Sequence, residues 1–278
     1  MLRGVQVRVA VGDIDTFYLE EGSGDPVLLL HGSGPGVSAY ANWQKTIPGL
    51  SGGFRVLAPD IVGYGSTSRP DDVVYSLRTW TDHVVGFMDA LGVARAAFVG
   101  NSLGGRIALD LAERFPDRVS RMVLMGAPGV GMVITEGLNA LRAYEPSLEN
   151  MRTLLLDHFA IDKSIITDEL VKIRYEASVE TYDAYRAMFF DPRHAGNELG
   201  ITEQQARSIT TPSLLVHGRE DSVVSPEVAW TMARLLPNAD LHVFARCGHW
   251  TQIERAEEFT ELVRAFLGAE EGAETLRP

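Results

Sequence analysis

Cysteine and long apolar runs are scarce in this sequence. Cys247 is the single cysteine among 278 residues, so no disulfide can form within the chain. The first residues contain no long apolar stretch of the kind found in signal peptides, and the longest aliphatic run, residues 27–30, is far too short to span a bilayer. These features predict a soluble protein of a reducing compartment, and we expect it in the cytoplasm.

Positive charge is scarce as well. The chain has 25 lysines and arginines against 37 acidic residues, which gives a formal net charge of -12 and an isoelectric point near 5.0. Such a balance opposes binding to nucleic acid and to anionic membrane surfaces, and we expect neither as a partner. An anionic small molecule would gain nothing from this overall field. Its site would need a cation of its own.

Motifs for metals and cofactors are missing. The histidines are scattered, and no His-Glu-x-x-His or paired-cysteine motif appears. A glycine-rich dinucleotide fingerprint is missing too. We therefore expect no metal site and no cofactor.

The pattern of apolar residues predicts an α/β protein with a mostly parallel sheet. Residues 6–11 and 16–20 alternate around a turn and indicate an antiparallel edge hairpin. Buried-strand runs then alternate with helical patterns, whereas only helical patterns occur between residues 130 and 207. We expect core segments at 1–129 and 208–270, a helical cap at 130–207 and a disordered tail at 271–278. Helices are expected over residues 39–47, 77–91, 226–236 and 256–267.

Residues 96–110 contain a strand, a tight turn and the start of a helix in succession. The turn contains Gly-x-Ser-x-Gly as Gly100, Ser102 and Gly104. This is the pattern of a nucleophile elbow, in which a strained serine stands at a helix N-terminus where an anion is stabilised. Cys247 is the other candidate nucleophile, and we interpret it as a bystander because Ser102 is better placed.

A serine hydroxyl needs a general base, and the base needs an orienting carboxylate. In an open parallel sheet such groups lie in loops after the carboxyl ends of strands. His31, His217 and His249 follow predicted strands, and the first two suit structural positions, so we expect His249 to be the base. Asp221 has the chain order expected of the acid, with Glu220 as the neighbouring alternative.

An oxyanion hole is expected from two backbone N–H groups. One belongs to Leu103, directly after the serine, and the other to Ser33 in the glycine-rich loop 31–36.

Several motifs resemble those of the α/β-hydrolase superfamily over nearly the whole chain, and more narrowly those of the meta-cleavage product hydrolases. That family acts on ring-fission products in the bacterial degradation of aromatic compounds. The shared motifs are His-Gly-Ser-Gly-Pro-Gly at 31–36 with Asn42, Gly-Asn-Ser-x-Gly-Gly at 100–105, Arg-Tyr-Glu-Ala at 174–177 and Gly-His-Trp at 248–250. Segments 135–140 and 246–254 resemble the branch for monocyclic products, such as 2-hydroxymuconate semialdehyde and its 6-alkyl relatives.

The resemblance implies an α/β-hydrolase fold, with an eight-stranded sheet flanked by helices and a helical cap, that hydrolyses a carbon–carbon bond of an anionic dienoate. It also implies a homo-oligomer. Arg174 would pair with the substrate carboxylate, because arginine presents a fixed fork of donors. Asn101 and Asn42 would bind the 2-oxo or 2-hydroxy end. Three further residues would shape the pocket: Trp250, Phe159 and Val224.

Two other functions fit the same motifs. A carboxylesterase or lactonase would share the serine, histidine and aspartate but would turn over simple esters and tolerate loss of Arg174. A non-catalytic ligand-binding protein of this fold would turn over neither esters nor dienoates, while a ligand would still raise its thermal stability.

Overall fold

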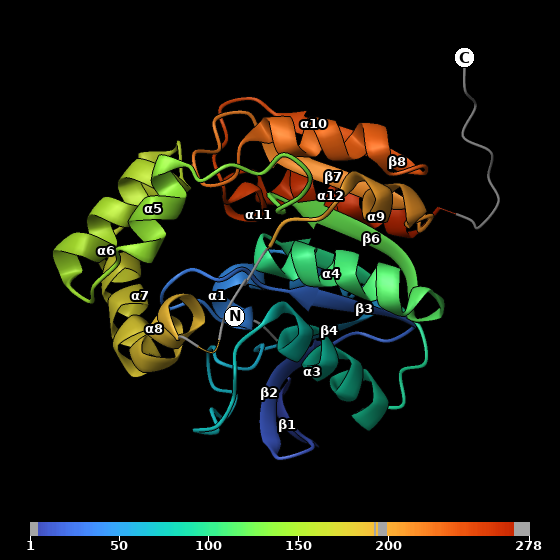
Figure 1. Cartoon of the computed structure of the whole chain (residues 1–278), viewed down its shortest axis with the longest axis horizontal. Helices are drawn as coiled ribbons and strands as arrows, with labels where there is room; N and C mark the ends of the chain where they lie inside the picture. Colours follow the sequence, from blue (N-terminus) through green and yellow to red (C-terminus); the bar gives the residue numbers. More distant parts are fainter. Residues whose placement is uncertain (1–4, 192, 194–198, 270–278) are drawn as a thin grey trace.

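The computed structural model describes residues 5–191, 193 and 199–269, so the expected tail at 271–278 lies outside the described residues. Their centre is an eight-stranded sheet of order β1-β2-β4-β3-β5-β6-β7-β8 (Figure 1). The hairpin of β1 and β2 joins β4 in antiparallel pairing, and the other neighbours are parallel. The predicted mostly parallel sheet is confirmed. The strands are β1 (Val5–Val11), β2 (Ile14–Glu21), β3 (Asp25–Leu30), β4 (Phe54–Pro59), β5 (Ala96–Asn101), β6 (Val119–Met125), β7 (Ser213–Gly218) and β8 (Ala239–Phe244).

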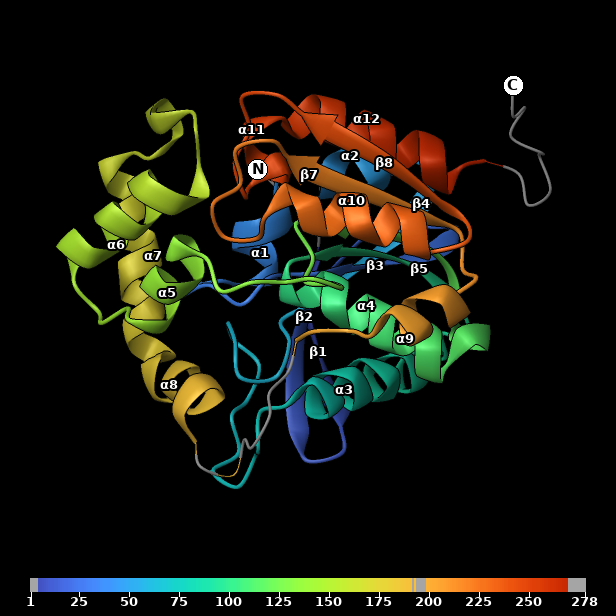
Figure 2. The same ribbon diagram turned by 45° about the horizontal axis from the view of Figure 1, so that its top comes forward.

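Helices cover both faces of the sheet, and each face has its own hydrophobic core (Figure 2). Successive side chains of a strand point to opposite faces, so Leu28 and Leu30 join one core while Val27 and Leu29 join the other. The first core includes residues of α3 (Leu77–Ala90), α4 (Leu103–Arg114) and α10 (Pro226–Leu235). The second includes residues of α1 (Ala39–Trp43), α2 (Ile47–Leu50) and α12 (Ala256–Leu267).

The predicted helix at residues 77–91 matches α3, and capping residues account for both of its ends. The Ser76 side chain accepts the backbone N–H of Thr79 at the start of α3, and Gly92 adopts φ +66° just after its end. The prediction of one helix over residues 39–47 was wrong, because α1 ends at Trp43 and α2 begins at Ile47. Pro48 lies in the first turn of α2, where it has no N–H to continue a helix from residue 44.

Residues 136–190 form a group of helices beyond the carboxyl end of the sheet, on the left of Figure 1. They comprise α5 (Glu136–Arg142), α6 (Leu148–Leu154), a π-helical turn (Leu155–Phe159), a 3₁₀ turn (Lys163–Ile165), α7 (Asp168–Glu180) and α8 (Tyr182–Phe190). The next helix, α9 (Glu203–Ser208), contacts α10 on the sheet layer. None of the described helices combines the length and apolarity needed to cross a membrane.

Candidate active site

A nucleophile elbow joins β5 to α4. Ser102 has φ 51° and ψ -113°, a conformation that residues with a Cβ rarely adopt, and its N–H donates to the Met125 carbonyl at 2.8 Å. A Cβ on Gly104 would lie 2.1 Å from the Leu30 oxygen, and one on Gly100 would lie 2.4 Å from the backbone of Gly104. The turn therefore requires glycine at both positions, and it places the serine at the N-terminus of α4.

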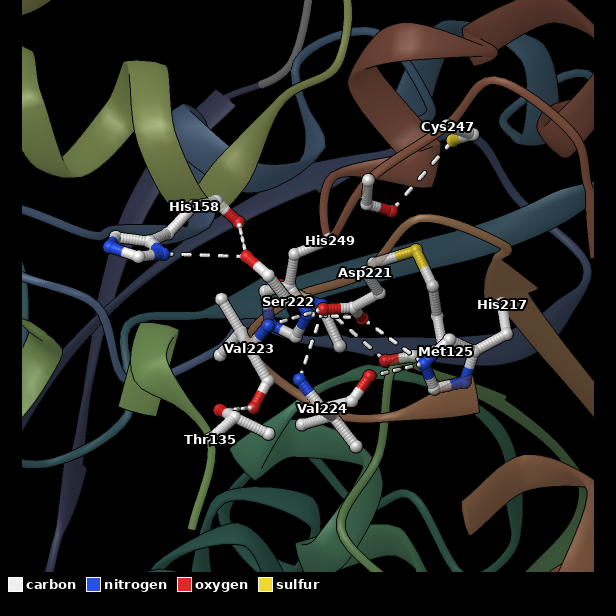
Figure 3. A network of polar contacts seen from close by, with 12 residues as sticks. Met125, Thr135, His158, His217, Asp221, Ser222, Val223, Val224, Cys247 and His249 are labelled. Atoms are coloured by element: carbon white, nitrogen blue, oxygen red, sulfur yellow. Dashed lines mark hydrogen bonds and ion pairs between the residues drawn. The ribbon is translucent and has the colours of Figure 1, made fainter. Parts of the chain in front are cut away.

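A buried histidine–aspartate pair lies in the loops that follow β7 and β8. Nδ1–H of His249 donates to Oδ2 of Asp221 at 2.7 Å (Figure 3). Glu220, the alternative acid, instead accepts from the Cys247 backbone N–H and from the Arg219 side chain. The structure thus brings Asp221, and not Glu220, to His249.

Asp221 accepts from several further donors. Its Oδ1 accepts the backbone N–H groups of Val223 and Val224 at 2.8 and 3.0 Å. Nε2 of His217 lies 3.1 Å from Oδ2 and 2.9 Å from the Val224 carbonyl, so this nitrogen carries a proton. Burial would raise the pKa of Asp221, but the charge of His249 and the bonds from both histidines hold that pKa well below its usual range.

His217 is a contributor that the sequence did not reveal. Burial would lower its pKa, yet the hydrogen bond and the charge of Asp221 raise that pKa above its ordinary value. From the sequence, only a structural position was predicted for His217. The spacing of four residues between His217 and Asp221 across a tight turn was the available signal.

The carboxyl end of β6 lies next to both Ser102 and the histidine–aspartate pair. Met125, which accepts the Ser102 N–H, is followed by Gly126. A Cβ on Gly126 would lie 3.0 Å from Cε1 and Nδ1 of His249 and 3.3 Å from Oδ2 of Asp221. Three carboxyl ends, those of β5, β7 and β8, therefore converge on one site.

Two neighbouring titratable groups, His31 and Cys247, are held in uncharged forms. The Ile61 N–H donates to Nε2 of His31, and Nδ1 of His31 donates to the Gly32 carbonyl, while burial lowers the His31 pKa to about 4. Burial also raises the pKa of the Cys247 thiol far above its ordinary value, so a thiolate is disfavoured. Within the described part of the chain, no group of three or more His, Cys, Asp or Glu residues could hold a metal ion.

The glycine-rich loop after β3 passes directly over the elbow. A Cβ on Gly32 would lie 3.0 Å from the Asn101 Oδ1 atom and 3.3 Å from the Ser102 Cβ atom. Ser33 and Leu103, whose N–H groups are the expected oxyanion donors, line one common cavity. Backbone N–H groups can point at a ligand in such a loop.

Arg174 is a buried cation next to this loop. Only 4 % of it is exposed, its guanidinium lies 5.2 Å from the centre of the Trp250 ring, and its Nη2 would be 3.7 Å from a Cβ on Gly34. Among the described residues, no carboxylate lies within 4 Å of it, and its Nε has no hydrogen-bond partner there. Burial lowers the pKa of Arg174 to about 10, so it still carries its charge at neutral pH.

The other predicted binding residues differ in what they contact. Asn42 is buried, its Nδ2 is unpartnered within the described residues, and it lines a cavity of about 190 Å³ with Arg174 and Trp250. Asn101 donates from Nδ2 to the Met125 carbonyl at 3.4 Å. The Phe159 ring contacts those of His249 and Trp250, with centroids 5.7 and 4.9 Å apart. Val224 acts through its backbone, as described above for Asp221 and His217.

A larger cavity of about 600 Å³ separates α5 and α8 from the sheet domain. Its wall is mainly apolar and draws on segments far apart in the sequence. Apart from Ser33 and Leu103, none of these residues was predicted as a site residue: Tyr64, Trp80, Met132, Val133, Ile134, Leu138, Leu141, Arg142, Met188, Phe189, Phe190, Leu199 and Gly200. Large apolar side chains at residues 130–190 were the available signal.

Comparisons with known proteins agree with this geometry. A family model described as alpha/beta hydrolase fold matches residues 25–256. The solved structure of a meta-cleavage product hydrolase from Pseudomonas fluorescens IP01, CumD, matches with a TM-score of 0.90 and 48% identity. The match covers 94% of this chain and 97% of that one, and CumD was solved as a serine-to-alanine variant with acetates. The chain belongs to the meta-cleavage product hydrolases of the α/β-hydrolase family.

This hydrolase is also similar to two named enzymes along almost their full lengths. It is 46% identical to the 2-hydroxy-6-oxo-2,4-heptadienoate hydrolase of Pseudomonas putida F1, over 95% of this chain and 96% of that one. It is likewise 46% identical to the 2-hydroxymuconate semialdehyde hydrolase of Pseudomonas sp. strain CF600, over 96% and 95%. The helices at residues 136–190 and the sheet domain both fall within these matches.

Proposed function

We propose that this hydrolase cleaves the C5–C6 bond of 2-hydroxy-6-oxo-2,4-dienoates of the 2-hydroxymuconate semialdehyde type. The observation that carries the proposal is Arg174, a buried guanidinium without a carboxylate partner among the described residues, close to the loop that crosses the elbow. A buried cation without a counterion suits a substrate carboxylate. The names of the two relatives support the same substrate class.

The substrate would bind with its carboxylate at Arg174 and its 2-oxygen near Asn42 and Asn101. Protonation of C5 converts the dienol into the keto form, which allows the C1–C5 fragment to leave as an enol. His249 is the residue placed to assist that proton transfer, since the Asp221 carboxylate fixes the orientation of its ring.

Cleavage requires attack on the C6 carbonyl. Ser102 Oγ forms the bond to C6 while its proton passes to His249, and the oxyanion is held by the N–H groups of Leu103 and Ser33. The C5–C6 bond then breaks, and its electron pair enters the departing dienolate. Water then attacks the acyl group on Ser102, the C6–Oγ bond breaks, and Oγ regains its proton as the acyl group leaves as a small acid. The same residues would serve attack by a water that His249 activates.

The assignment extends to the rest of the architecture. We assign residues 130–207 to a cap over the core segments 1–129 and 208–270. The helices at residues 136–190 would close the site, whereas α9 at the end of this segment packs against α10 of the core. The proposal includes a homo-oligomer, which the family resemblance implies, and a cytoplasmic location, which the composition suggests. Gel filtration with light scattering tests the oligomeric state.

The test follows the decay of the yellow dienolate absorbance with 2-hydroxymuconate semialdehyde, its 6-methyl analogue and its 6-phenyl analogue. We expect fast decay with the first two and slow decay with the third. The reverse order would show that the enzyme prefers 6-phenyl substrates. No decay with any of the three, together with brisk hydrolysis of p-nitrophenyl acetate, would replace the proposal with a carboxylesterase.

Variants of the three proposed catalytic residues locate the chemistry. Ser102→Ala, His249→Ala and Asp221→Asn should each remain folded by circular dichroism and lower kcat by about 10⁴-fold or more, with Asp221→Asn the mildest. Wild-type turnover in any one of them would remove that residue from the catalytic site.

A further inference from the structure

Glu254, at the end of α11 (Thr251–Glu254), joins two segments that meet at the active site. Its Oε1 accepts the backbone N–H of Gly248 at 2.7 Å, directly before His249. Its Oε2 accepts the N–H groups of Ile161 and Asp162 at 2.7 and 2.9 Å. One carboxylate thus serves three backbone donors, two in the proposed cap and one in the histidine loop.

A second set of contacts runs along the same seam. The carbonyl of Phe159 accepts the N–H groups of His249 at 3.0 Å and Trp250 at 3.3 Å. Close approach is required there, since a Cβ on Gly248 would lie 2.8 Å from that carbonyl oxygen. Residues 155–159 form a π-helical turn, a geometry that is frequent at functional sites.

The two sets of bonds tie the backbone around His249 to one short cap segment. The histidine loop also contains Arg246 at φ 54°, a conformation that needs support from its surroundings. Hydrogen bonds to an ionised carboxylate are among the stronger ones in proteins. A loop held in this way keeps its side chain in place, and a base displaced by about 1 Å loses roughly 100-fold in rate.

We propose that Glu254 is a positioning residue, which clamps cap residues 159–162 onto the loop of His249 so that cap closure and alignment of the base occur together. The inference relies on the assignment of Ser102 and His249 in the proposed function, but not on the identity of the substrate.

The test compares Glu254→Gln with wild type. An amide has only one accepting oxygen, so the variant loses the bond to Gly248 or those to Ile161 and Asp162. Two readouts are needed: the rate at which diisopropyl fluorophosphate inactivates the enzyme, and amide exchange of peptides covering residues 155–165 and 245–252. Inactivation by diisopropyl fluorophosphate requires the activated serine but no dienoate.

We expect labelling to slow by about 10- to 100-fold and exchange to accelerate in both peptides together, with kcat for the dienoate falling and KM changing less than about threefold. Glu257→Gln is the matched control, because Glu257 is an exposed glutamate at the start of α12. Glu254→Asp, which keeps two acceptors on a shorter stem, should lie between Glu254→Gln and wild type, and covers the case in which Glu254→Gln fails to fold.

Labelling within twofold of wild type in Glu254→Gln would overturn the proposal, even if exchange accelerates, because the carboxylate would then stabilise the fold only. Faster exchange in one peptide without the other would overturn the clamp. If the wild type labels normally but turns over no dienoate, the proposed function fails, while slower labelling in Glu254→Gln would still support this inference.

Discussion

At the scale of single residues, the histidines differ in what their ring nitrogens contact. His249 donates from Nδ1 to the Asp221 carboxylate, which fixes the orientation of its ring. In His83 the Val62 N–H donates to Nδ1, so Nε2 carries the proton and donates to Thr16 Oγ1. A protonated His83 would lose the bond from Val62. Its burial beneath the loop after β4 therefore favours the neutral ring.

This difference predicts how stability depends on pH. Burial lowers the pKa of His83 to about 4 in the folded protein, below the ordinary value of 6.5. The neutral ring thus stabilises the fold fully above pH 6.5, and the contribution is lost as the pH falls toward 4. His83→Gln preserves a donor and an acceptor but does not titrate.

Between pH 7.5 and 5, the free energy of unfolding of wild type should fall by about 2 kcal/mol relative to that of His83→Gln. Urea unfolding at each pH measures this, and His242→Gln on the exposed part of β8 controls for the loss of a histidine as such. Parallel curves for wild type and His83→Gln would show that His83 is not held neutral.

At the scale of elements, the elbow was the feature most visible in the sequence. Within 15 residues, the sequence has an apolar run for the strand, two glycines that the turn requires and a helical pattern. Each of these signals depends only on neighbouring residues. The helices at residues 77–90 and 256–267 were predictable for the same reason, since a capping residue or an apolar stripe marks them. The break between α1 and α2 was not predicted, although Pro48 has no N–H to bond to the carbonyl of residue 44.

The strain of the elbow yields a second prediction. The backbone at residue 102 has φ 51° and ψ -113°, which is unfavourable for a residue with a Cβ. Ser102→Ala keeps the Cβ and its strain, whereas Ser102→Gly removes both. We expect Ser102→Gly to have a free energy of unfolding about 1 kcal/mol above that of Ser102→Ala, after the entropic cost of glycine in the unfolded chain. Urea unfolding of the two variants compares them. An alanine variant of equal or greater stability would contradict strain at this position.

At the scale of the whole molecule, the site depends on contacts that no local pattern encodes. The residues that line the large cavity range from 33 to 200, and Glu254 joins Ile161 and Asp162 of the proposed cap to the histidine loop. The large apolar side chains at residues 130–190 were a signal for the cavity, but nothing in the sequence indicated the contact through Glu254. Without the family resemblance, the sequence favours an exposed helix arginine at Arg174, paired with Glu176 or Asp168. Only the resemblance indicated a role in substrate binding. Val224 was predicted as a pocket residue, yet its backbone is what contacts Asp221.

Net charge matters at this scale too. A chain of formal charge -12 repels a dienoate at long range, so recognition depends on a cation that the protein shields from its own carboxylates. Arg174 fits this role, because its guanidinium lies over Trp250 and away from the described acidic side chains. Removing it would leave the substrate carboxylate unpaired in a buried site, at a cost of about 3 to 5 kcal/mol.

The most direct measurement of the central claim is therefore the ratio of kcat/KM for 2-hydroxymuconate semialdehyde to kcat/KM for p-nitrophenyl acetate, in wild type and Arg174→Gln. The ester has no carboxylate, so the ratio isolates recognition of the anion. Lys172→Gln, an exposed residue of the same helix, is the control. The account predicts a ratio lowered by about 100-fold or more in Arg174→Gln and unchanged in Lys172→Gln. An unchanged ratio in Arg174→Gln would contradict it, because Arg174 would then not recognise the substrate carboxylate.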